Sequence, residues 1–235
     1  MQLSIIFTVF ESQEALNRQC KHFSKMDLSR DIEFVFVDDG SVPELTLPPC
    51  ELNIRLYQTK DYRKWTQGIA RNFGVKMAHG KYVLCTDIDH ILSYETIMWC
   101  YDFRGNMAIF PRELGLLLED GTFTQDRSAL MKYGLDPKRK TLAIKPHGNT
   151  YCMLKETFWE IGGIDEQFCG TGFHASHRRG EDAYFTRKWH HWADPQGIKC
   201  ELGPTIYTFT NGQYNVNGET NPRGLFHTLS YLPKQ

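Results

Sequence analysis

Hydrophobic residues in the first part of the chain fall into short, unbroken runs that are separated by amphipathic stretches. Residues 3–9 and 32–37 are almost wholly apolar and rich in β-branched side chains, which is typical of strands buried on both faces of a parallel sheet. Residues 54–57 could form a third strand, and the apolar run at residues 82–85 predicts a fourth. The pattern therefore predicts a series of buried strands.

The stretches between these runs have helical spacing. Residues 11–25 place Leu16, Cys20 and Phe23 on one face, and residues 65–78 have a similar apolar stripe. Strands that alternate with helices indicate a parallel sheet with right-handed crossovers. We therefore expect an α/β fold with a mostly parallel central sheet flanked by helices.

The second half of the chain is less regular. Residues 111–125 predict a loop with a hairpin, and residues 155–161 and 181–192 predict helices. Residues 212–235 contain Gly, Asn and Pro throughout and predict an irregular tail. No repeat or linker divides the sequence, so we expect a single domain over residues 1–235.

The composition is that of a folded globular protein. Hydrophobic residues make up 41% of the 235 residues and charged residues 23%, and the formal net charge is −1. This balance gives no global attraction to nucleic acid or to an anionic membrane.

The cellular location can be predicted from the seven cysteines and from the lack of long apolar runs. The number of cysteines is odd and no C-x-x-C pair occurs, which is typical of reduced thiols rather than a disulfide framework. No run approaches the roughly 20 apolar residues of a transmembrane helix, and the N-terminus lacks the pattern of a signal peptide. We therefore expect a cytoplasmic protein without a transmembrane segment.

Three acidic pairs lie where a ligand site is expected, since ligands of open parallel sheets bind at the carboxyl ends of the strands. Two pairs follow predicted strands directly and one opens a predicted helix. The pairs are Asp38 with Asp39, Asp87 with Asp89, and Glu181 with Asp182. Neighbouring carboxylates repel one another, and a divalent cation or donors on a ligand would offset that cost.

Asp87 and Asp89 are the strongest candidates among these residues. Alternate residues of an extended segment point the same way, so the two carboxylates can share one task, such as holding a metal ion and a ribose. Mg²⁺ and Mn²⁺ prefer oxygen ligands and leave positions open for substrate phosphates. The alternative interpretation is a solvated acidic turn.

Five short elements together resemble family 2 glycosyltransferases. They occur in the order of that family and cover roughly residues 3–190. The elements are Val37-Asp-Asp-Gly-Ser41, Ala70-Arg-Asn-Phe-Gly-Val75, Ala78-His-Gly-Lys-Tyr-Val83 leading into Asp87-Ile-Asp89, Gly162-Gly-Ile-Asp-Glu166, and Gly180-Glu-Asp182. They resemble the family's V-D-D-G-S, A-R-N-x-G, A-x-G-x-Y with D-x-D, G-G-F-D-E and G-E-D elements.

The resemblance implies a GT-A fold, with a nucleotide-sugar-binding half at residues 1–110 and an acceptor-binding half at residues 111–235. It implies a metal-dependent, inverting glycosyltransferase that uses a nucleotide sugar, with a UDP-sugar as the leading candidate and Mn²⁺ or Mg²⁺ as the cofactor. The expected acceptor is a cytoplasmic saccharide or lipid-linked saccharide. One alternative is a glycosyltransferase that acts on hydroxymethylated bases in DNA, and another is a non-catalytic domain that binds nucleotide or saccharide.

The resemblance also implies roles for the donor site. Asp39 would accept from the nucleobase, with Thr8 beside it at the end of the first strand. Arg71 would reach the base or the diphosphate, Asp87 would contact the ribose and Asp89 the metal ion. The alternative for Arg71 is a solvated position on its helix.

The catalytic roles fall on the second half. Asp182 would be the general base that takes the acceptor's proton, with Glu181 as the fallback; the alternative for both is a favourable acidic helix N-terminus. His227 is the candidate third metal ligand, in competition with His147 and His174.

Acceptor contacts are the least defined part of the site. Trp65 could stack on a sugar or base, or it could be a core residue at the helix entry. Arg178 and Arg179 are weak candidates for acceptor binding. Together with residues 138–140 they could instead contact the phosphates of DNA.

Overall fold

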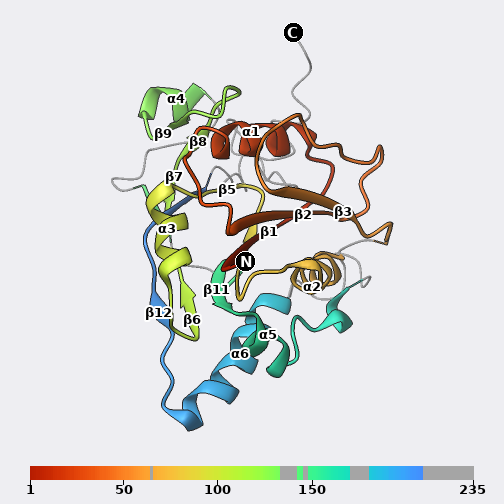
Figure 1. Ribbon diagram of the computed structural model, residues 1–235, viewed down its shortest axis with the longest axis vertical. Helices are drawn as coiled ribbons and strands as arrows, with labels where there is room; N and C mark the ends of the chain where they lie inside the picture. Colours follow the sequence, from red (N-terminus) through yellow and green to blue (C-terminus); the bar gives the residue numbers. More distant parts are fainter. Residues whose placement is uncertain (64–65, 133–141, 145–147, 170–179, 209–235) are drawn as a thin grey trace.

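The computed structural model describes residues 1–63, 66–132, 142–144, 148–169 and 180–208, and its centre is one large sheet (Figure 1). The strands of this sheet are β1 (Leu3–Val9), β2 (Ile32–Asp38), β3 (Ile54–Gln58), β4 (Tyr82–Asp87), β6 (Met107–Ile109), β11 (Tyr151–Leu154) and β12 (Glu201–Leu202). They lie in the order β12-β6-β11-β4-β1-β2-β3.

The parallel half of the sheet lines up the ends of its strands. β1 pairs in parallel with both β2 and β4, and β2 pairs in parallel with β3. The register places Thr8 opposite Asp87 and Val9 opposite Asp38, so the last residues of three strands meet at one edge. This confirms the four predicted strands and places two of the acidic pairs together.

The other half of the sheet was not predicted. β11 pairs antiparallel with β4 and with β6, and β12 runs parallel to β6. The sheet is thus mixed, with a parallel half in the first part of the chain.

Six α-helices are present in the part of the chain that the structure describes. They are α1 (Gln13–Phe23), α2 (Gln67–Met77), α3 (Tyr94–Asp102), α4 (Arg127–Lys132), α5 (Lys155–Glu160) and α6 (Glu181–Ala193). α1, α2, α5 and α6 match the predicted helices to within two residues at each end. α3 was not predicted; it begins at Ser93, whose side chain accepts a hydrogen bond from the backbone N–H of Thr96.

The helices cover both faces of the sheet (Figure 1). Phe7 of β1 packs in the same apolar cluster as Phe23 of α1 and Ile97 of α3. Its neighbour Ile6 points to the other face, in the cluster that contains residues of α2, α5 and α6, such as Phe185. Burial on both faces explains why β1 is apolar at almost every position.

Two smaller sheets complete the described part. Their strands are β5 (His90–Ile91), β7 (Arg112–Leu114), β8 (Leu116–Leu117), β9 (Phe123–Thr124), β10 (Ala143–Ile144) and β13 (Ile206–Thr208). β8 and β9 form the hairpin that was predicted within residues 111–125, and the other four form a sheet in the order β10-β7-β13-β5. The predicted irregular tail at residues 212–235 lies outside the described residues.

Candidate functional site

The candidate site lies at the carboxyl edge of the parallel strands. Asp87 is the last residue of β4, Thr8 lies opposite it on β1, and Asp39 directly follows β2. Gln67, the first residue of α2, donates through Nε2 to Oδ1 of Asp87 at 2.8 Å and to Oγ1 of Thr8 at 3.3 Å. Sequence reasoning missed Gln67, because its role depends on where α2 enters the fold.

Asp39 is a buried carboxyl group beside the end of β2. Its side chain is 8% exposed and Oδ1 accepts a hydrogen bond from Oγ1 of Thr66 at 2.7 Å. Burial raises the pKa of Asp39 to about 6, and the nearby Asp61 and Asp38 add to this against the lowering effect of Thr66. A buried carboxyl group with this pKa suits a hydrogen-bond donor or acceptor on a ligand.

The neighbouring Asp38 shapes the loop rather than facing a ligand. Its two carboxylate oxygens accept from the backbone N–H groups of Ser41 and Leu45, each at 2.9 Å. Gly40, directly before Ser41, has φ of +78°. A Cβ on this residue would lie 2.2 Å from the carbonyl oxygen of Asp61. Only glycine fits this position, which explains the Asp-Asp-Gly-Ser order of the element.

Arg71 of α2 joins the first half of the site to the second. Its side chain is 1% exposed; Nη2 contacts Oδ1 of Asp87 at 2.5 Å and Nη1 contacts Oδ1 of Asp182 at 2.7 Å. Burial alone would lower the pKa of the guanidinium, but the two carboxylates raise it well above its ordinary value. The alternative of a solvated helix position is therefore wrong.

Asp87 is held from several sides. Asn149, just before β11, donates through its side-chain amide to Oδ2, while Arg71 and Gln67 contact Oδ1. Burial would raise the pKa of Asp87, but the Arg71 guanidinium, His90 and the hydrogen bond from Asn149 together hold the pKa below its usual range. Asp87 is thus fixed as an ionised carboxylate.

The described residues contain one group that could bind a metal ion. Ligand atoms of Asp87, Asp89 and His90 all lie within 4.8 Å of one another. Residues 88 and 89 form a turn after β4, so the expectation of an extended segment is wrong and the turn brings the carboxylates together. Burial and the neighbouring Asp87 raise the pKa of Asp89 to about 7. A divalent cation would offset this repulsion between the carboxylates.

His90 was not among the predicted ligands. The imidazole is buried, and Nδ1 lies 3.0 Å from Oγ1 of Thr86 and 2.8 Å from Oγ1 of Thr150. Where Nδ1 carries the proton and donates to these hydroxyls, Nε2 carries the lone pair that a metal ion needs. The detectable signal in the sequence was a histidine directly after Asp-x-Asp. His227, the predicted ligand, lies outside the described residues.

Asp182 and Glu181 begin α6, close to this group. Gly148, which precedes Asn149, packs against the first two turns of α6, since a Cβ there would lie 2.8 Å from Oγ1 of Thr186 and 3.5 Å from the carbonyl oxygen of Asp182. Asp182 is 22% exposed at its side chain, whereas Glu181 is buried at 1%. The structure therefore brings together Thr8, Asp39, Arg71, Asp87, Asp89, Glu181 and Asp182. Other candidates fall outside the described residues: Trp65, residues 138–140, His147, His174, Arg178 and Arg179.

The element at residues 162–166 supports the site from behind α2. Asn72, next to Arg71, donates to the carbonyl oxygen of Ile164 at 2.8 Å and accepts from its backbone N–H at 2.9 Å. Gly163 has φ of +57°, and a Cβ there would lie 2.9 Å from Oδ1 of Asn72. The segment at residues 162–166 and the helix α2 therefore pack closely together, although they are far apart in the sequence.

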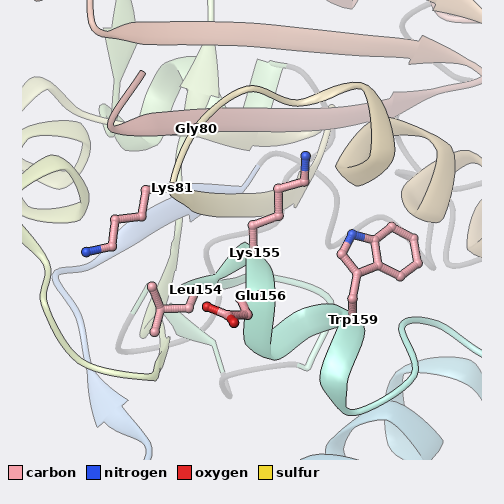
Figure 2. Close-up of a pocket in the computed structure, with 6 residues that line it drawn as sticks. All are labelled: Gly80, Lys81, Leu154, Lys155, Glu156 and Trp159. Atoms are coloured by element: carbon pink, nitrogen blue, oxygen red, sulfur yellow. The ribbon is translucent and has the colours of Figure 1, made fainter.

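A separate pocket of about 350 Å³ lies at the amino end of β4, away from the site (Figure 2). Its lining comes from the turn before β4, the end of β11 and the start of α5. The lining residues are Gly80, Lys81, Leu154, Lys155, Glu156 and Trp159. Nζ of Lys155 donates to the carbonyl oxygen of Ala78 at 2.5 Å, which ties α5 to the end of α2. None of the candidate site residues lines this pocket.

Comparisons with solved structures define the fold. It is the GT-A fold, which the chain shares with solved proteins that include the two that follow. With residues 1–349 of Staphylococcus aureus (S. aureus) TarS bound to UDP-GlcNAc it has 16% identity and a TM-score of 0.55, over 88% of this chain and 58% of that chain. With the mannosyltransferase PcManGT from Pyrobaculum calidifontis, bound to GDP-Man and Mn²⁺, it has 14% identity and a TM-score of 0.52, over 88% and 56%. The chain thus spans a little over half the length of these proteins.

The sequence comparison finds a family model that matches the first part of the chain. Residues 4–101 match the family model described as glycosyl transferase family 2. The match covers less than half of the chain and includes the first three of the five elements, and the shared fold agrees with it. No curated protein sequence matches the chain. Within the described residues, no helix is long and apolar enough to cross a membrane.

Proposed function

We propose that this chain is a metal-dependent, inverting glycosyltransferase that moves a sugar from a nucleotide sugar, a UDP-sugar in particular, to an acceptor hydroxyl. The observation that carries the proposal is the contact of Arg71 with both Asp87 and Asp182. The contact supports the proposal because Asp182, the predicted base, shares Arg71 with Asp87, which belongs to the predicted donor site.

For the donor, Asp39 and Thr8 would hold the nucleobase and Asp87 the ribose. The burial of Asp39 and its raised pKa support a hydrogen bond to a polar edge of the base. Asp89 and His90 would hold Mn²⁺ or Mg²⁺, with His227 as a further predicted ligand. The nitrogen ligand favours Mn²⁺, since imidazole suits transition metals better than it suits Mg²⁺. The solved structures of TarS with UDP-GlcNAc and of PcManGT with GDP-Man and Mn²⁺ support this class of donor.

The metal ion would supply positive charge that stabilises the diphosphate leaving group. Asp182 would accept the proton of the acceptor hydroxyl as its oxygen bonds to the anomeric carbon. The bond from that carbon to the phosphate oxygen breaks, and the nucleoside diphosphate leaves from the opposite face. Attack from that side inverts the anomeric centre without a covalent intermediate. The greater exposure of Asp182 supports it over the buried Glu181 as the base.

The acceptor that we propose is a saccharide or a lipid-linked saccharide in the cytoplasm. The net charge of −1 supports this over DNA, because a DNA-binding surface usually needs excess positive charge. Trp65, Arg178 and Arg179 stay predictions for the acceptor side. The non-catalytic alternative is disfavoured by the retention of Asp39, Asp87, Asp89 and Asp182 at one edge of the sheet.

The first test is thermal stability against UDP, GDP and their sugars, each with Mn²⁺ and with EDTA. A ligand at 100 times its Kd stabilises the folded state by about 2.7 kcal/mol, which raises the Tm of a chain of this size by roughly 5–10 °C. We expect such a shift for one nucleotide, and only with the metal ion. No shift with any nucleotide at saturating Mn²⁺ would rule out the proposed donor site.

A further inference from the structure

Arg71 lies at the meeting point of three elements that carry the proposed reaction. It belongs to α2, its Nη2 contacts Asp87 at the end of β4, and its Nη1 contacts Asp182 at the start of α6. The two nitrogens belong to one rigid, planar group. Their fixed spacing therefore sets the separation of the two carboxylate oxygens that they contact.

The surroundings of Arg71 leave little room for a ligand. Its side chain is 1% exposed, and its third nitrogen, Nε, is buried as well. A phosphate or base could reach the guanidinium only if one of the two ion pairs opened. Opening a pair would leave a carboxylate beside the site without its cation, which is unfavourable in a buried environment.

Asp87 does not depend on Arg71 alone. Gln67, one turn earlier on α2, contacts the same oxygen of Asp87, and Asn149 contacts the other. A change at Arg71 would therefore leave Asp87 with two donors and still able to meet the donor's ribose. The Nη1 atom of the same Arg71 contacts Asp182, so this ion pair joins the start of α6 to α2 and to the end of β4.

We propose that Arg71 is a positioning residue, which holds the proposed base Asp182 in register with Asp87 and does not itself bind the nucleotide. This inference rests on the proposed function and replaces the donor contact that the family resemblance implies for Arg71. A base that is displaced by about 1 Å can cost two orders of magnitude in rate.

The test compares R71K with R18K. Lysine keeps the charge but lacks the two-pronged geometry, so it cannot hold both carboxylates at the same spacing. Arg18 is the matched control, because it is also buried and contacts Glu14 and Glu119 on a different part of the fold. Calorimetry measures the Kd of UDP and of GDP with Mn²⁺. Release of nucleoside diphosphate from UDP-GlcNAc and GDP-mannose, with water as the acceptor, measures the rate at saturating donor.

We expect R71K to bind the nucleotide within threefold of the unaltered protein and to release it at least thirtyfold more slowly, while R18K changes neither. A Kd that rises tenfold or more in R71K alone would overturn the inference in favour of a donor contact. An unchanged rate in R71K would also overturn it. If the unaltered protein binds neither nucleotide, the proposed function itself fails.

A structure of the unaltered protein with UDP or GDP and Mn²⁺ tests the positioning role of Arg71 even if R71K does not fold. We expect the guanidinium to remain between Asp87 and Asp182 in that complex. A guanidinium turned onto the diphosphate or the base would refute the positioning role.

Discussion

Replacement of Gly40 by alanine tests how the loop beside Asp39 is built. Gly40 has φ of +78°, a region in which an L-residue costs roughly 1–2 kcal/mol. Its added Cβ would also lie 2.2 Å from the carbonyl oxygen of Asp61, whereas ordinary contact begins at 3.4 Å. The backbone at Asp61 must therefore move by about 1 Å, and such overpacking costs typically 1–3 kcal/mol.

Gly197 provides the matched control. It has φ of +68°, but nothing lies within 4 Å of the position that its Cβ would occupy. G197A should therefore show the backbone cost alone, about 1 kcal/mol after the gain from a less flexible unfolded chain. We expect G40A to lose about 2–4 kcal/mol and G197A about 1 kcal/mol.

Urea denaturation of both variants, at the same pH and temperature, measures the two losses of unfolding free energy. The Tm increase given by the bound nucleotide should also shrink in G40A and stay unchanged in G197A, because the displaced loop carries Asp39. Equal destabilisation of the two variants would contradict the close approach at Asp61.

Three further predictions concern the side chains of the site. Asp39 has a pKa of about 6 in the folded protein against 3.8 unfolded, so the folded state holds the proton more tightly. The free energy of unfolding therefore falls as the pH rises from about 4 to about 6. At pH 7 this costs about 3 kcal/mol, so D39N should raise the free energy of unfolding by roughly 1–3 kcal/mol and weaken nucleotide binding; a lower stability at pH 7 would contradict the burial effect. D89A should abolish turnover and H90N should weaken Mn²⁺ binding, which titration by electron paramagnetic resonance measures directly; full activity of D89A would exclude its role as a ligand. D182N should keep the nucleotide Kd but lower turnover about 10²–10⁴-fold, and a variant as fast as the unaltered protein would move the base elsewhere.

The parallel half of the fold could be predicted because β1, β2 and most of β4 are nearly continuous apolar runs. Every residue of β1 and β2 is buried, and strands that are buried on both faces need apolar residues at almost every position. β6, β11 and β12 have three, four and two residues, too few for a period to appear. Their pairing is set by long-range contacts that no local pattern records.

Some residues of the candidate site could be predicted from the sequence and others could not. Asp39, Asp87 and Asp182 were found through short motifs that continue into predicted strands or helices. Gln67, His90 and Asn149 were not, since their importance comes from side chains that meet only in the folded chain. The exclusion of Arg71 from solvent was also invisible, because a helix with one buried arginine looks amphipathic in sequence.

The antiparallel pairing of β11 with β4 has a consequence for modularity. The segment that matches the family model ends at residue 101, yet β11, α5 and α6 cover the edge of β4 and one face of its sheet. A fragment cut at this boundary would leave β4 with an open row of backbone donors and acceptors, a known template for aggregation. The second half is therefore part of the same folding unit as β4, and we expect residues 1–101 not to fold as a separate module.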